Sequence, residues 1–146
     1  MTADDRPDAG PPEPAASVAG EATSRQPPDE VRLREVIRHL LTPARAGIYL
    51  GRDDLARLGA TLGFPLPALD RRIMLEHLFV AAGPAGLVPR LLDLLREETD
   101  AWIAAYADWE RQYPHTAPIW QEWRARAEAL QATLVDMQRD AEAARA

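Results

Sequence analysis

The fold is decided by "LVPRLLDLLREETDAWIAAYADWERQY", residues 87–113, and "PIWQEWRARAEALQATLVDMQRDAEAAR", residues 118–145. In both stretches, apolar side chains recur at steps of three and four residues, which is the spacing of a seam between two packed helices. The seam positions are Val88, Leu92, Leu95, Thr99, Trp102, Tyr106, Trp109 and Tyr113 in the first stretch and Trp120, Trp123, Ala127, Leu130, Leu134, Met137 and Ala141 in the second. Because only about four residues around "PHTAP" connect them, the sequence predicts an antiparallel helical hairpin.

Aromatic residues concentrate at the closed end of this predicted hairpin. All four tryptophans and two of the three tyrosines lie within residues 102–123. The seam spacing favours packing of these rings between the two helices. A ligand or peptide surface near the tip is the alternative, because tryptophan is seldom wholly buried and both ring types keep a polar group.

Two shorter helices are predicted at the start of the folded region. Residues 30–41 carry apolar side chains at helical spacing, with Asp29 placed to cap the helix and Pro43 placed to stop it. The connector "TPARAGIYLG" follows. Residues 52–62 then form a second helix, which ends at Gly63 because glycine adopts the left-handed conformation that closes many helices.

A third predicted helix spans residues 67–82. Its apolar side chains, Ile73 among them, cover so much of its circumference that we expect neighbours to bury it on several sides. The sequence "GPAG" at residues 83–86 is expected to end it. The fold class is therefore all-α, a bundle of about five helices with a long antiparallel C-terminal helical hairpin.

The first 28 residues differ in composition from the rest of the chain. They hold six of the thirteen prolines and one valine, with no leucine, isoleucine or aromatic residue. Such a segment cannot bury enough apolar surface to offset the entropy of ordering, so residues 1–28 are predicted to be a disordered tail and residues 29–146 a helical domain. The chain shows neither a signal-peptide pattern nor eighteen consecutive apolar residues, and we expect a cytoplasmic protein without a membrane partner.

Signatures of chemistry are absent from the sequence. The chain has no cysteine, its only serines are Ser17 and Ser24 in the predicted tail, and no Glu-x-x-His or phosphate-binding glycine loop occurs. These absences argue against thiol or serine nucleophiles, a di-metal bundle site and a nucleotide cofactor. We therefore expect a non-enzymatic protein with no cofactor and no metal site. The formal charge of -6 also disfavours nonspecific nucleic-acid binding.

One segment favours a different function. Residues 53–79 read as helix, glycine-containing turn and second helix, with Arg71 and Arg72 on the second helix. A helix-turn-helix transcription regulator would place that second helix in the major groove of DNA, with these arginines near phosphates. Pro65 and Pro67 lie where such a recognition helix would start, which weighs against this hypothesis.

Residues 40–83, "LLTPARAGIYLGRDDLARLGATLGFPLPALDRRIMLEHLFVAAG", and residues 91–102, "LLDLLREETDAW", resemble the TorD-type accessory chaperones of molybdenum oxidoreductases. The resemblance covers about residues 36–109 and follows the order of segments. It implies an all-helical protein that binds the leader peptide or an exposed part of a redox enzyme without catalysing a reaction. The chain is shorter than typical members and lacks their Asp-His signature, with "EHLF" at residues 76–79 in its place, so no binding residue is transferred.

The sequence thus predicts a chaperone-like accessory protein that captures a peptide or partner subunit in a cleft between helices. The predicted apolar contacts are Tyr49, Trp120 and Trp123, and the predicted contacts to basic groups are Glu97, Glu98 and Asp100. Two alternatives stay open: the transcription regulator, and a structural subunit that docks through the hairpin. The hairpin can complete a monomer or pair across a homodimer.

Overall fold

The computed structural model of the protein describes residues 28–144. The predicted disorder of the first 28 residues therefore falls, except for Pro28, outside the described residues. The contacts of the chain divide it into Met1–Leu33 and Arg34–Ala146, and the packing described below lies within the second part.

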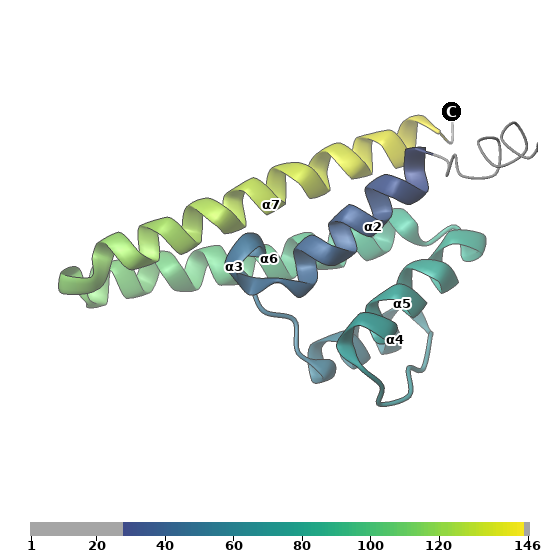
Figure 1. Ribbon diagram of the computed structural model, residues 1–146, viewed down its shortest axis with the longest axis horizontal. Helices are drawn as coiled ribbons and strands as arrows, with labels where there is room; N and C mark the ends of the chain where they lie inside the picture. The colour runs from purple at the N-terminus through teal and green to yellow at the C-terminus, as the bar shows by residue number, and fades with distance from the viewer. Residues whose placement is uncertain (1–27, 145–146) are drawn as a thin grey trace, which may run out of the picture. The chain divides into compact units, whose positions relative to one another are not determined.

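Helices make up the described part of the chain, and no strand occurs in residues 28–144. The elements are α2 (Pro28–Leu41), α3 (Pro43–Ala46), α4 (Arg52–Leu62), α5 (Arg71–Ala85), α6 (Val88–Gln112), the 3-10 helix η1 (Pro114–Thr116) and α7 (Ala117–Ala143). The predicted all-α class and long C-terminal hairpin are confirmed. Figure 1 shows α6 and α7 side by side, with the closed end of the hairpin extending beyond α3, α4 and α5.

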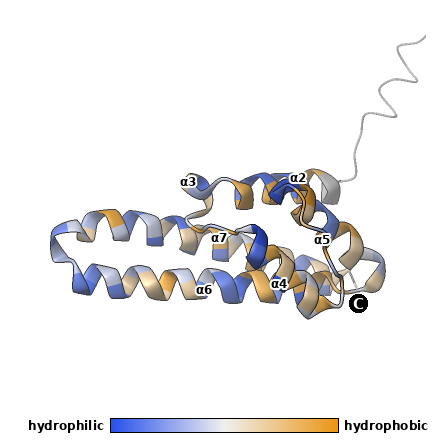
Figure 2. Ribbon diagram, turned by 90° about the horizontal axis from the view of Figure 1, so that it is seen from below, coloured by the Kyte–Doolittle hydropathy of each residue, from blue (hydrophilic) through white to orange (hydrophobic). Residues whose placement is uncertain are grey.

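The core forms where the shorter helices pack against the open half of the hairpin. The largest of its fully buried side chains are Leu40, Ile48, Leu50, Leu55, Met74, Leu75, Leu78, Leu91, Leu92, Leu95, Leu130 and Leu134. Contacts between α6 and α7 are the most extensive, and α4 and α5 pack on each other and on α6. Figure 2 shows the amphipathic pattern behind this packing, since polar (blue) and apolar (orange) turns alternate along α6 and α7.

Helix α5 differs from its prediction at both ends. It begins at Arg71 because the Asp70 side chain caps it, accepting a hydrogen bond of 3.0 Å from the Arg72 backbone N–H. It continues through Gly83 and Pro84 instead of ending before them. Pro84 lies in the last turn, where its missing N–H removes only one helical hydrogen bond. Gly86, at φ 69°, then closes the helix.

The predicted burial of this helix on several sides was wrong. Ile73 is 40% exposed and Val80 is 71% exposed, whereas Leu75 and Leu78 are fully buried. Within residues 28–144, the helices that pack against α5 are α4 and α6, and the side that carries Ile73 and Val80 is open to solvent. An isolated apolar side chain on a helix surface is common in proteins and costs little.

The connector between the first two predicted helices contains an additional short helix, α3, and a tight junction with α7. Gly47 follows α3 with φ 74°, and a Cβ atom placed there would lie 2.5 Å from the backbone N of Ala127 and 2.7 Å from the carbonyl O of Trp123. Only glycine fits this approach of two backbones. The carbonyl of Gly47 also accepts a hydrogen bond from the buried hydroxyl of Tyr106 on α6. Both hairpin helices are therefore joined to this loop.

Candidate functional site

The aromatic side chains near the closed end of the hairpin pack on one another. The ring centroids of Trp109 and Trp120 are 4.9 Å apart, and those of Tyr106 and Trp120 are 6.2 Å apart with planes at 17°. Trp102 extends the row, with its ring 5.8 Å from that of Tyr106. These are ordinary packing distances between rings, so the members of the cluster pack directly on one another.

Tyr106 is the most buried member of the cluster. It is 4% exposed, and burial raises the pKa of its hydroxyl above the usual value of 10.0. The cause is desolvation, which disfavours the phenolate. Because its hydroxyl donates to the Gly47 carbonyl, the neutral form is also the one that this contact requires.

Other apolar side chains at the tip face solvent. Tyr113 is 56% exposed and Ile119 is 50% exposed, on either side of η1. Trp109 and Trp120 are partly exposed at the same end of the hairpin, and the indole N–H of Trp120 donates to the Thr116 hydroxyl at 2.9 Å. We define these four residues, Trp109, Tyr113, Ile119 and Trp120, as the tip surface.

Tyr113 corrects one part of the predicted seam. It stands just after the last residue of α6, where its backbone N–H bonds to the Trp109 carbonyl, and its ring is exposed instead of packing between the helices. Ile119 was not among the predicted site residues. The sequence could have indicated its exposure, because Ile119 is a large apolar residue that directly precedes the seam residue Trp120 and so falls outside the seam spacing.

Charged side chains around the tip surface are paired within the hairpin. The ion pairs are Arg111 with Asp108, Arg124 with Glu110 at 2.8 Å, and Arg126 with Glu122. The guanidinium of Arg126 also lies over the ring of Trp123, 4.8 Å from its centroid. Because these charges have partners inside the chain, an apolar partner can cover the tip surface without leaving them unpaired.

The predicted apolar contact Tyr49 lies in a different environment. Its ring is 48% exposed and carries the Arg71 guanidinium 4.4 Å from its centroid. Within residues 28–144, no ring contact joins Tyr49 to Trp120 or Trp123, whereas Trp120 belongs to the aromatic cluster. The structure thus does not bring the three predicted apolar residues together.

The three predicted acidic contacts also have separate partners. Glu97 lies 3.9 Å from Arg90, and the carboxylate of Asp100 accepts a hydrogen bond from Gln131 on α7. Glu98 pairs with Arg57 of α4. Each carboxylate therefore contacts a different group, and they do not converge on a common site.

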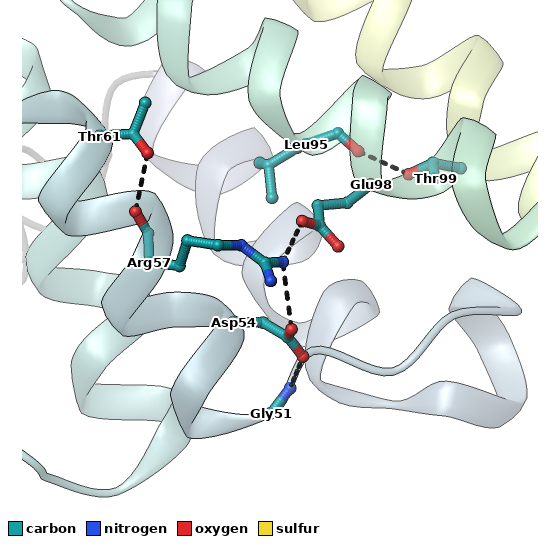
Figure 3. Close-up of polar contacts among 7 residues, drawn as sticks. All are labelled: Gly51, Asp54, Arg57, Thr61, Leu95, Glu98 and Thr99. Atoms are coloured by element: carbon teal, nitrogen blue, oxygen red, sulfur yellow. Dashed lines mark hydrogen bonds and ion pairs between the residues drawn. The ribbon is translucent and has the colours of Figure 1, made fainter.

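The pair between Glu98 and Arg57 belongs to a polar cluster that joins α4 to α6 (Figure 3). Arg57 also contacts Asp54 at 3.2 Å, and the Asp54 carboxylate accepts a hydrogen bond of 2.8 Å from the Gly51 backbone N–H. The hydrogen bond and charge of Glu98 raise the pKa of Arg57 above its usual value. Arg57 is largely exposed, so this cluster contributes modestly to stability.

The two arginines of the DNA-binding hypothesis are engaged within the chain. Arg71 donates from Nε to the Leu50 carbonyl at 2.6 Å, in addition to lying over Tyr49. Arg72 donates from Nε to Glu76 at 3.1 Å and is otherwise exposed. To bind phosphates, Arg71 would have to give up a backbone contact and a ring contact.

Within residues 28–144, no group of three or more histidine, aspartate or glutamate side chains is arranged to hold a metal ion. Nor does any helix in this range combine the length and apolar character that a membrane crossing requires. Comparisons of the chain with protein-family models, with curated proteins and with solved structures gave no match.

Proposed function

We propose that the protein is a non-enzymatic accessory protein that binds an apolar segment of a partner protein at the tip surface of the α6–α7 hairpin. The resemblance of residues 36–109 to TorD-type chaperones suggests the class of partner, a redox enzyme or its leader peptide. The chemistry of the tip surface supports a binding role independently of that resemblance.

The observation that carries this proposal is the exposure of Tyr113 and Ile119 at the end of the hairpin that also holds the aromatic cluster. Both side chains are at least half exposed, and in the chain they lie one turn after Trp109 and directly before Trp120, whose rings pack on each other. Tyrosine and tryptophan dominate the energetics of many protein interfaces, because they bury large areas and lose little side-chain entropy. The removal of this apolar surface from water would favour association.

The paired charges near the tip surface specify the chemistry of the partner. Since Arg111, Arg124 and Arg126 each contact a carboxylate of the hairpin, these arginines are not available to recognise a charged group. An apolar stretch, such as the hydrophobic part of a leader peptide, fits this surface better than a run of charged residues. The sequence-based expectation that Glu97, Glu98 and Asp100 attract an arginine-bearing segment has no shared site to support it.

Intrinsic tryptophan fluorescence provides the test, because Trp109 and Trp120 form part of the tip surface. We would titrate the protein with leader peptides of redox enzymes from the same host and repeat the titration with the double variant Tyr113→Ser, Ile119→Ser. We expect the double variant to bind at least about tenfold more weakly, because each side chain removed is an apolar contact. Equal affinities for the double variant and the unchanged protein would contradict the proposal.

A matched control comes from α5. Val80 is 71% exposed and lies outside the tip surface, so Val80→Ser removes exposed apolar surface elsewhere. We expect it to leave peptide affinity unchanged. A loss of affinity in Val80→Ser equal to that in the tip variant would indicate that general surface hydrophobicity, and not the tip surface, binds the peptide.

A further inference from the structure

We infer that Arg34, Arg38 and Arg45 form a second docking surface, for an acidic segment of a partner protein. We call these three residues the arginine ridge. This surface is additional to the tip surface and differs from it in chemistry, because it is charged where the tip surface is apolar.

In the described part of the chain, the arginines of the ridge lack the side-chain partners that most arginines of the hairpin have. Most arginines of the hairpin contact a carboxylate or an amide, such as Arg90 with Glu97 and Arg124 with Glu110. The three ridge side chains are exposed, and within the residues that the structure describes none of them has an ion pair. An external anion can therefore approach their guanidinium groups without displacing a carboxylate of that part of the chain.

Local geometry places Arg34 and Arg38 on one face of α2 and brings the backbone of Arg45 to the end of that helix. Arg34 and Arg38 are four residues apart on α2, one helical turn, and point away from the buried residues Val36, Ile37 and Leu40. The imidazole Nε2 of His39 lies 3.0 Å from the carbonyl O of Arg45, which joins the end of α3 to the last turn of α2. The fold therefore brings the backbone of Arg45, whose side chain is exposed, to the end of α2 that carries Arg38.

The charge of this region is opposite to that of the whole protein. Residues 34–52 contain four arginines and one glutamate, whereas the full chain has a formal charge of -6. Helix α7 contains three arginines and five carboxylate residues, so its formal charge is negative. A short anionic segment is attracted to the arginine ridge, but a long polyanion that extends beyond it meets the acidic part of the molecule.

Spacing and composition favour a peptide over a nucleic acid. The step between Arg34 and Arg38, about 6 Å along the helix axis, equals the step between carboxylates four residues apart on a partner helix. Guanidinium groups bind carboxylates through paired N–H donors. Glu35 is exposed beside them and has no ion pair in residues 28–144, so it repels a uniformly anionic backbone but accepts a basic residue of a mixed peptide.

A labelled helical peptide tests this surface directly. The probe is an alanine-rich peptide with glutamates four residues apart along one face, and its control has glutamine at the same positions. Fluorescence anisotropy should rise and saturate with the glutamate peptide only, and binding should weaken as salt is added. The triple variant Arg34→Gln, Arg38→Gln, Arg45→Gln should bind at least about fivefold more weakly, since exposed ion pairs contribute modestly one by one.

Arg139 provides the matched control, because it is exposed on α7 and also lacks an ion pair in the described part of the chain. Arg139→Gln should bind the glutamate peptide like the unchanged protein. A lack of binding to the glutamate peptide would overturn the inference, and so would equal binding by the triple variant. Duplex DNA of equal charge that binds more tightly than the peptide and loses its affinity in the triple variant would reassign the arginine ridge to nucleic acid.

The two proposals fail separately. The double variant Tyr113→Ser, Ile119→Ser changes no charge and should keep full affinity for the glutamate peptide. A loss of glutamate-peptide binding in that variant would mean that a single surface serves both ligands, which would overturn the arginine ridge as a separate site.

Discussion

Single residues decide how the loop after α3 meets the hairpin. Gly47 combines a left-handed backbone, φ 74°, with a backbone-to-backbone approach to α7 that leaves no room for a Cβ atom. Its carbonyl accepts a hydrogen bond from the Tyr106 hydroxyl on α6. One residue therefore links the loop to both helices of the hairpin, next to the aromatic cluster that includes part of the tip surface.

Gly47→Ala should lower the free energy of unfolding by about 2 to 4 kcal/mol for two reasons. An alanine in the left-handed conformation is strained, and its Cβ atom would collide with the backbone of α7. Urea denaturation measures the change. Gly63→Ala is the control, because Gly63 has φ 84° but a Cβ atom added there would meet no other atom within 4 Å, and it should cost only about 1 kcal/mol of strain. Equal losses for the two variants would mean that the approach to α7 does not restrict residue 47.

Tyr106 should make stability sensitive to alkaline pH. Its pKa is raised in the folded state by burial, so the unfolded chain releases this proton at lower pH than the folded protein does. The resulting stability is fully present below the unfolded pKa, about 10, and is lost as the pH rises through the folded pKa. The chain contains no lysine that would titrate in the same range. Denaturation curves between about pH 9 and 11 should show a smaller loss of stability in Tyr106→Phe, and an identical pH dependence would contradict this assignment.

Helices α6 and α7 carry the seam that the sequence predicted. Leu95 and Leu134 lie within α6 and α7, and both side chains are fully buried. Thr99 is also fully buried in the seam, and its hydroxyl donates to the Leu95 carbonyl at 2.7 Å, so it brings no unsatisfied polar group into the core (Figure 3).

Leu95→Ala and Leu134→Ala should each cost about 2 to 5 kcal/mol of unfolding free energy, because truncation in a packed core leaves a cavity. Val80→Ala serves as the surface control, with an expected change under about 0.5 kcal/mol. The variants are compared by the midpoints of their denaturant unfolding curves, provided that the slope of unfolding free energy against denaturant concentration is unchanged. Losses at both leucines as small as that of the surface control would show that the seam lies elsewhere.

Helix α5 offers a test of the corrected burial pattern. Ile73 is 40% exposed, so Ile73→Asp should still fold and should cost little, because the carboxylate can reach water. Leu75→Asp should prevent folding, since Leu75 is fully buried and the carboxylate of an aspartate there would have no partner. Circular dichroism distinguishes a folded from an unfolded variant. Unfolding of both variants would restore the expectation that neighbours cover α5 on several sides.

At the scale of the whole molecule, the proposed binding role rests on two surfaces of different chemistry. The tip surface is apolar with paired charges around it, and the arginine ridge is positively charged without an ion pair in residues 28–144. The helix-turn-helix alternative relies on Arg71 and Arg72, which contact Leu50, Tyr49 and Glu76.

We expect negligible binding of the intact protein to duplex DNA at physiological salt, because its net charge is -6 and Arg71 is engaged within the chain. Electrophoretic mobility shifts with the unchanged protein and Arg72→Ala provide the measurement. Arg72→Ala is preferred to a change at Arg71, whose loss would also disturb the contact with Leu50. Tight, salt-sensitive DNA binding that weakens in Arg72→Ala would support the transcription regulator.

The sequence alone determined the all-α class, the hairpin and the gathering of aromatic residues at its closed end, because helical periodicity and short connections are local properties. Only the tertiary structure decided which side of α5 is covered, that Tyr113 leaves the seam, and that Glu98 pairs with Arg57 of α4. A periodic pattern shows that a face is apolar, but burial depends on how many neighbours pack there. Ion pairs between distant residues likewise depend on where the fold brings their helices together.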